Sequence, residues 1–261
     1  MVVDMKFKSL FSVIVGLSFV SFSIYAKEKV VINAEDDWAP YSSKVADTAQ
    51  GFAEEVIKAA FKSVDVDVQF NVVSYAKCTD DITKNAEVSG VAGCFDTARS
   101  AANEKDYSWP TTPLFKAKVF IWARKDYKGS DLKFENLKKQ KVGMTNGYEY
   151  GAEFDGAPAG ELTKDVGATD QLLFKKLLQS RYDLAVAYEF PAKVVLSSPD
   201  MTKEKEGVKS VGTLSDLELY LSFSKLPKYK KYLDLYNEGM KKIMADGTYK
   251  KLSDALEAKY K

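Results

Sequence analysis

The chain has 261 residues, of which 46% are hydrophobic and 29% are charged, a composition typical of a folded globular protein and not of a disordered one. Its 38 basic and 37 acidic residues are interspersed and give a formal net charge of +1, so no basic stripe favours nucleic acid as a partner. The sequence contains no histidine, which excludes zinc hydrolases and enzymes with Ser-His or Cys-His nucleophiles.

The first 26 residues are predicted to be a signal peptide. Lys6 and Lys8 precede an apolar run at residues 10–20, and a small and polar stretch ends at Ala26, after which cleavage is expected. The apolar run is too short to span a bilayer comfortably, and no later stretch approaches the ~20 apolar residues of a membrane helix. We therefore expect a mature chain that is secreted into the periplasm in soluble form.

A run of acidic and aromatic residues follows the first predicted strand. The β-branched strand at residues 30–34 leads into the sequence AEDDWAPY at 34–41, and an amphipathic helix is predicted at residues 51–62. Ligands of open α/β sheets bind where strands end, so a rigidly held aromatic side chain here suits a small-molecule site. The alternative is that Trp38 and Tyr41 are simply core aromatics beside a turn.

The next elements continue the alternation of strands and helices. Residues 66–73 alternate with period two and predict a strand, a polar helix follows Ser74-Tyr75, and residues 88–94 predict a short strand of small residues. Such alternation implies a mostly parallel sheet in an α/β fold.

The chain has only two cysteines, Cys78 and Cys94. In an oxidising periplasm the pair is expected to form a disulfide, which closes a loop of about 15 residues. The alternative is two buried and inert thiols. A catalytic thiol is not expected, because no histidine can activate it.

The sequence resembles the family 3 periplasmic solute-binding proteins, the receptors of polar amino-acid ABC transporters. The resemblance rests on W-x-P-Y at 38–41 followed by G-F at 51–52, and on D-G-T-Y at 246–249 between two predicted helices. It covers the whole mature chain and implies a two-lobed periplasmic binding protein fold of type II with two hinge crossings.

The implied crossings lie near residues 113–116 and 213–217. Lobe 1 would then comprise residues 27–113 and 217–261, and lobe 2 would comprise residues 114–216.

In this family an Arg in a turn after the third strand grips the ligand carboxylate with two parallel hydrogen bonds. Here Asn103-Glu104 stands where the family has R-E, and the segment after Gly93 carries extra residues. Arg99 is the nearest candidate to replace the missing clamp, and its alternative role is that of a solvated residue at a helix start.

Residues 137–148 resemble the segment that opens the second lobe in this family, where a strand leads into a turn. In this arrangement Asn146, Gly147 and Tyr148 would point backbone N–H groups toward the ligand. Further on, a helix is predicted at 170–180 and a strand at 181–192. The acid that binds the α-ammonium in the family aligns with Tyr188 when counted from Asp183, and with Glu189 when counted from Pro191.

A slip of one residue reverses the face of a strand, so only one of these two side chains can face the cleft. We favour Tyr188. Glu189 could pair with an ammonium group, whereas Tyr188 offers a hydroxyl and a ring face.

Taken together, the resemblance implies an exported, monomeric receptor without cofactor, metal or catalytic activity, which passes its solute to a membrane ABC permease. Trp38 and Tyr75 would stack on the ligand, while Glu35 and Arg99 would complement its charge. Two other functions share this fold: a receptor that serves a membrane signalling protein, and a periplasmic dehydratase of the cyclohexadienyl type.

Overall fold

The computed structural model describes Met1, residues 27–201 and residues 204–260. Apart from Met1, the predicted signal peptide lies outside the described residues. No helix in the described part of the chain is both long and apolar enough to cross a membrane.

One eight-stranded mixed sheet runs through the molecule, in the order β5-β1-β6-β11-β7-β10-β8-β9. Its strands are β1 (Glu28–Glu35), β5 (Val66–Val73), β6 (Gly93–Ala98), β7 (Phe115–Arg124), β8 (Lys141–Thr145), β9 (Thr163–Gly167), β10 (Leu184–Tyr188) and β11 (Val208–Phe223). β1 pairs in parallel with β5 and β6, and β8 pairs in parallel with β9 and β10. We call the β5-β1-β6 group with its helices the first half and the β10-β8-β9 group with its helices the second half.

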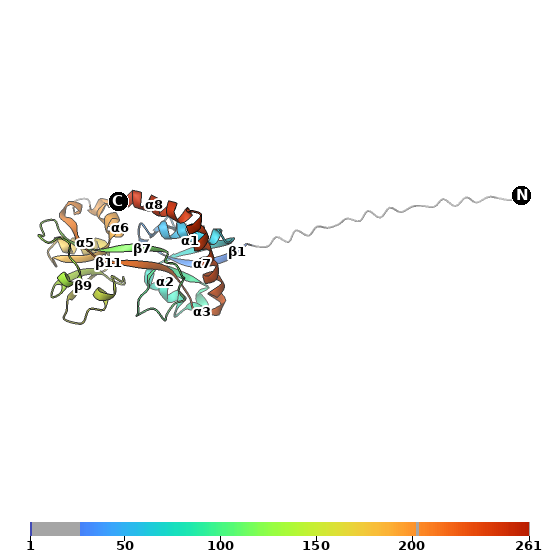
Figure 1. Ribbon diagram of the computed structural model, residues 1–261, viewed down its shortest axis with the longest axis horizontal. Coiled ribbons are helices and arrows are strands. Elements are labelled where there is room, and N and C mark those ends of the chain that lie inside the picture. The colour runs from blue at the N-terminus through green and yellow to red at the C-terminus, as the bar shows by residue number, and fades with distance from the viewer. Residues whose placement is uncertain (2–26, 202–203, 261) are drawn as a thin grey trace.

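The two halves are joined by the long antiparallel pair of β7 and β11. The pairing extends from Val208 opposite Arg124 to Leu219 opposite Phe115, after which β11 pairs with β6. Figure 1 shows both strands between the two groups of helices. The register of β11 shifts between Ser210 and Gly212 and again between Thr213 and Ser215, and such bulges bend a strand.

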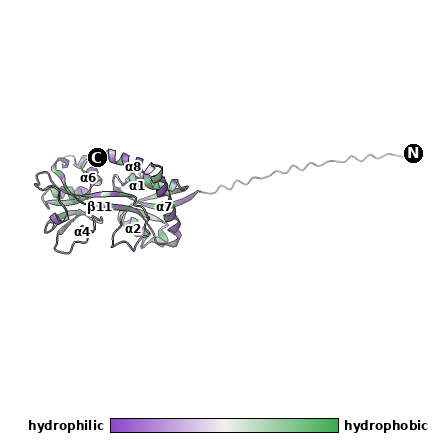
Figure 2. Cartoon of the chain, in the orientation of Figure 1, coloured by the Kyte–Doolittle hydropathy of each residue, from purple (hydrophilic) through white to green (hydrophobic). Residues whose placement is uncertain are grey.

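Helices cover both halves of the sheet. They are α1 (Phe52–Lys62), α2 (Tyr75–Ile82), α3 (Ala86–Ser89), α4 (Ala152–Asp155), α5 (Asp170–Leu178), α6 (Glu189–Leu196), α7 (Lys230–Ala245) and α8 (Thr248–Tyr260). Short 3-10 turns are η1 (Phe134–Leu137), η2 (Pro199–Met201), η3 (Lys205–Gly207) and η4 (Pro227–Tyr229). Figure 2 shows mainly hydrophilic residues along α7, whose buried side, with Tyr236, Met240 and Ile243, packs against the core.

The contact between α1 and α7 requires a residue without a side chain. A Cβ atom at Gly239 would lie 2.2 Å from the backbone oxygen of Ala60, so the two helices approach each other there more closely than any larger residue allows. The apolar side chains of α1, among them Val56, Ile57 and Phe61, are fully buried in the same core. This core fixes the start of α1 next to the residues that follow β1.

Helix α8 extends from the first half to the second. Near its start the hydroxyl of Tyr249 donates to the backbone oxygen of Leu114 (3.0 Å). Near its end Lys193 of α6 donates to the backbone oxygen of Tyr260 (3.0 Å), and the rings of Tyr260 and Phe190 lie 5.9 Å apart. The end of α8 thus contacts α6, and Figure 1 shows the two helices close to each other there.

Several predicted elements differ from the structure. Residues 88–89 belong to helix α3, not to a strand, because Gly90 adopts a left-handed backbone (φ 71°) that ends the helix, and the strand begins only at Gly93. The predicted strand at 181–192 ends at Tyr188, since α6 begins at Glu189.

A further small sheet has no counterpart in the prediction. It consists of β2 (Asp37–Trp38), β3 (Ser42–Val45) and β4 (Thr48–Gln50), which pair in antiparallel fashion directly after β1. The positive φ angles of Ala46 and Asp47 form the tight turn between β3 and β4. The small sheet holds Trp38 on a strand rather than in a loop.

The predicted disulfide between Cys78 of α2 and Cys94 of β6 is confirmed, with Cα atoms 5.5 Å apart. Both residues are fully buried, together with Ile82 and Val91. The bond therefore ties α2 to the sheet beside β1.

Removing this bond should lower the free energy of unfolding by about 3 kcal/mol, because the crosslink closes a loop over a separation of 16 residues. We expect this loss in chemical denaturation of the Cys78→Ala/Cys94→Ala protein. The reduced wild-type protein, which keeps both sulfur atoms, is the matched control and should lose a similar amount. Equal stability of the oxidised and reduced proteins would contradict the expectation.

Candidate functional site

A cavity of about 540 Å³ lies where strands of both halves end. Its lining comes from the residues that follow β1, β5, β8 and β9, and from α6 with the turn after it. These are the carboxyl ends of parallel strands, the usual location of ligands in α/β sheets. The cavity brings together five predicted site residues: Glu35, Trp38, Tyr75, Asn146 and Tyr148.

Glu35 is the most deeply buried acid of this cavity. Only 4% of the residue is exposed, and the hydroxyl of Tyr148, from the other half, donates to its Oε1 atom (3.1 Å). Burial, and secondarily the nearby acids Asp36, Asp37 and Asp170, raise the pKa of Glu35 to about 8. The carboxyl group is therefore protonated over much of the neutral range.

Ser42 forms a hydrogen bond with the last residue of β1. Its Oγ atom lies 2.5 Å from the backbone oxygen of Glu35 and 2.7 Å from Oε1 of Glu54 on α1. Burial raises the pKa of Glu54 to about 7. The backbone at Glu35 is thus connected through one hydroxyl to the buried start of α1.

Aromatic rings from both halves form one wall of the cavity. The ring of Trp38 lies 4.8 Å from Tyr41, 6.0 Å from Tyr148 and, edge to face, 5.0 Å from Tyr188. Such ring pairs add to the energy of burial and fix the orientation of the indole. The indole Nε1 of Trp38 is buried and has no hydrogen-bond partner within the described residues.

The second half contributes an acid that the sequence analysis did not assign to the site. Asp170 opens α5 after the N-cap residue Thr169, whose hydroxyl accepts from the backbone N–H of Leu172. Its Oδ1 atom accepts a hydrogen bond from Thr145 (2.5 Å), and burial raises its pKa to about 6. Asp36, Asp37 and Asp200 also line the cavity.

Three of the predicted site residues, Gly147, Tyr188 and Arg99, do not line the cavity. Gly147 lies between two lining residues with a left-handed backbone (φ 86°), and Tyr188 lies behind Trp38, where its hydroxyl donates to the backbone oxygen of Glu149 (2.6 Å). Glu189, the alternative to Tyr188, accepts from Lys193 at the start of α6. Neither Tyr188 nor Glu189 is among the lining residues.

Arg99 also lies outside the cavity lining. Its guanidinium group donates two hydrogen bonds to Glu104, of 2.6 and 2.5 Å, and lies 5.6 Å from the ring centre of Trp109. This bidentate pair occupies the donors that the predicted carboxylate clamp would need.

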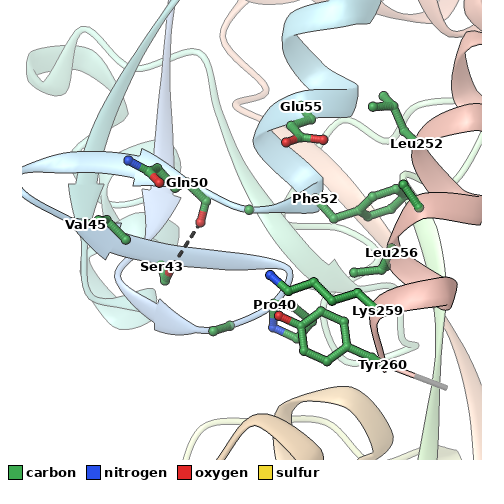
Figure 3. Close-up of a pocket in the computed structure, with 13 residues that line it drawn as sticks. Pro40, Ser43, Val45, Gln50, Phe52, Glu55, Leu252, Leu256, Lys259 and Tyr260 are labelled. Atoms are coloured by element: carbon green, nitrogen blue, oxygen red, sulfur yellow. Dashed lines mark hydrogen bonds between the residues drawn. The ribbon is translucent and has the colours of Figure 1, made fainter.

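A second cavity of about 410 Å³ lies between the small sheet, the start of α1 and α8, as Figure 3 shows. Ser43 donates there to the backbone oxygen of Gln50 (3.0 Å), and the exposed side chains of Glu55 and Lys259 lie at its rim. It contains none of the predicted site residues and no buried charged group. We therefore take the cavity around Glu35 as the candidate site.

No set of three or more residues in the described ranges is arranged to hold a metal ion. The residues of the candidate site that could interact with a solute offer acidic groups, hydroxyls, two amides and aromatic rings.

Comparison with known proteins gives one family and many similar folds. The family profile of the bacterial extracellular solute-binding proteins, family 3, matches residues 30–256. No curated protein matches the sequence.

Three solved structures with a similar fold are each at most 20% identical in sequence. An ancestral arginine-binding protein bound to glutamine is 20% identical (TM-score 0.69), with 88% of this chain and 98% of that chain covered. A histidine kinase sensor domain with similarity to periplasmic binding proteins is 16% identical (TM-score 0.72; 90% and 96% covered). The amino acid ABC transporter substrate-binding protein AbpA of Streptococcus pneumoniae, bound to L-arginine, is 17% identical (TM-score 0.68; 89% and 96% covered).

The raised pKa of Glu35 predicts a specific pH dependence of stability. Between its ordinary pKa of 4.5 and its pKa of about 8, the folded protein holds a proton that the unfolded chain has released, so stability should fall as the pH rises through this range. Replacement Glu35→Gln keeps an acceptor for Tyr148 but removes the charge. At about pH 8 the variant should be more stable than the wild type by at least ~1 kcal/mol.

Chemical denaturation at several pH values between about 5 and 8 measures this difference. Glu87→Gln, a change of an exposed acid on α3, is the matched control and should follow the wild type. Parallel curves for Glu35→Gln and the wild type would contradict the assignment of the buried proton to Glu35.

Proposed function

Because the chain belongs to the bacterial extracellular solute-binding proteins of family 3 and has the type II periplasmic binding protein fold, we propose that it captures a small polar solute, an amino acid or a related compound, for delivery to an ABC transporter. The observation that carries the proposal is the cavity around Glu35, whose lining comes from both halves of the sheet. Capture would take place between two lobes.

The proposed lobes are residues 27–113 with 217–261, and residues 114–216. Glu35, Trp38 and Tyr75 belong to the first of these, whereas Asn146 and Tyr148 belong to the second. The hydrogen bond from Tyr148 to Glu35 would therefore join the proposed lobes across the cavity.

The proposed hinge lies in the chain crossings near residues 113–116 and 213–217. One of the register shifts of β11, between Thr213 and Ser215, falls at the second crossing. A bulged strand has fewer regular ladder hydrogen bonds to break, which suits a segment that absorbs the rotation of one lobe against the other.

In the proposed complex the rings of Trp38, Tyr75 and Tyr148 would enclose the solute, and Glu35, Asn146 and the backbone at Gly147 would orient it. Tyr188 would act by supporting the indole of Trp38. We do not include Arg99 among the ligand contacts, because its donors are occupied by Glu104. The proposal involves no catalytic step.

We further propose that the receptor is a periplasmic monomer, exported by the signal peptide at residues 1–26, and that membrane permease subunits recognise its closed form. A signalling role is the second candidate, since a histidine kinase sensor domain has the same fold. Copurification from membranes distinguishes the two, because a transport receptor would bring permease subunits and a signalling receptor a sensor protein.

A thermal-shift screen of the purified protein against amino acids, polyamines, small carboxylic acids and short peptides tests capture itself. A solute at about one hundred times its dissociation constant stabilises the folded state by about 2.7 kcal/mol, which raises the melting temperature. At least one small polar solute should give such a shift. If no compound of a broad polar panel does so, the proposed function is wrong.

The variant Tyr148→Phe then tests the site of capture. It removes only the hydroxyl that joins the proposed lobes, so the affinity for the solute found in the screen should fall about fivefold, as expected for one hydrogen bond. Lys259→Ala, a change at the rim of the second cavity, is the control and should leave the affinity unchanged. The opposite pattern would place the ligand in the second cavity.

A further inference from the structure

The charges around the candidate site are all of one sign. Five acidic side chains line the cavity, from Glu35, Asp36, Asp37, Asp170 and Asp200, and no lysine or arginine is among the lining residues. None of the ion pairs that the structure forms within its described ranges includes any of these five acids.

The hydrogen bonds to the buried acids come from neutral groups. Tyr148 donates to Glu35, and Thr145 donates to Asp170. Lys44, which interacts weakly with Asp36, forms its ion pair with Asp47 instead. Within the described residues the cavity thus holds negative charge without a counter-charge, although acids elsewhere on the chain pair with lysines.

A ligand carboxylate would be unfavourable in this cavity. Asp170, with its pKa raised only to about 6, is ionised at neutral pH, and two like charges repel strongly where burial lowers the effective dielectric. Arg99, the one predicted clamp for a carboxylate, is occupied by Glu104 and does not line the cavity. No cationic group is therefore in place to hold the acid end of a free amino acid.

A second observation concerns a hydrogen-bond donor in this wall. Trp38 is 96% buried (4% exposed) and lines the cavity, yet its indole N–H has no acceptor within the described residues. A buried donor without a partner costs free energy unless a ligand or water accepts its hydrogen bond. The faces of the same indole and of Tyr75 and Tyr148 are suited to a cation.

We propose that the solute is a small organic cation that carries no carboxylate. The inference rests on the proposed function, since it names the class of solute for the same cavity. The cationic end would lie between Glu35 and Asp170, one acid from each half. It would pair with the carboxylate of Asp170 and favour loss of the proton from Glu35, so that both acids hold it between the halves. An uncharged oxygen of the ligand, where it has one, would accept from Trp38.

Matched pairs of compounds that differ mainly in the carboxylate test the inference. Agmatine against arginine, cadaverine against lysine, and choline against betaine keep the cation and differ at the acid end. In isothermal titration of the purified protein, at least one of the cations without a carboxylate should bind at least tenfold more tightly than its carboxylate partner. If no cation without a carboxylate binds at least tenfold more tightly than its carboxylate partner, the inference is overturned.

The variant Asp170→Asn locates the effect. It keeps an acceptor for Thr145 but removes the charge, so the affinity for the cation should fall at least tenfold, and the preference over the carboxylate partner should shrink. Glu87→Gln on α3 should change neither value. Unchanged cation affinity in Asp170→Asn would also overturn the inference.

The failure of the inference can be distinguished from the failure of the proposed function. If none of the three cations binds while an amino acid or a neutral solute does, the solute class is wrong and the receptor function stands. If the broad panel contains no ligand at all, both are wrong.

Discussion

The antiparallel pairing of β7 with β11 is the constraint on which the candidate site depends. It joins two groups of parallel strands into one sheet, and so it fixes how far the carboxyl end of β1 lies from the carboxyl end of β8. The hydrogen bond between Tyr148 and Glu35 spans this distance. The disulfide and the close approach of α1 and α7 at Gly239 make the first half rigid behind Glu35. The two register shifts in the pairing of β11 with β7 are the irregular points of a connection that is otherwise continuous.

The distribution of charge sets the cavity apart from the rest of the molecule. Elsewhere, Asp165 is partly buried between two lysines, which lower its pKa by hydrogen bonding and by their charge. In the cavity the reverse holds, since burial raises the pKa of Glu35 and of Asp170 without a cation to offset the cost. Groups that destabilise the empty protein in this way are typical of binding sites, where the ligand offsets the cost.

The sequence predicts most of the framework, because its strands and helices carry clear periodic patterns. β1, β5, α1, α7 and the final helix follow from such patterns, and the cysteine pair follows from export and number alone. Glu35, Trp38, Tyr75, Asn146 and Tyr148 lie in one cavity because each follows a predicted strand.

The elements that the prediction missed have weak or polar patterns. β3 and β9 are mostly polar, with little alternation, so neither was predicted. Asp170 was correctly assigned to the start of a helix, but without β9 nothing indicated that it follows the end of a strand. The pairing of Arg99 with Glu104 depends on turns at residues 101–107, whose geometry no periodic pattern specifies.

Ser42, on the strand β3 that was not predicted, has a role that depends on its hydroxyl group. Its hydroxyl has a single proton but lies within hydrogen-bond distance of two oxygen atoms, on Glu35 and on Glu54. If that proton goes to the backbone of Glu35, the second hydrogen bond requires Glu54 to be the donor, which agrees with its raised pKa of about 7. The end of β1 is then held by a relay of two hydrogen bonds that is complete only while Glu54 keeps its own proton.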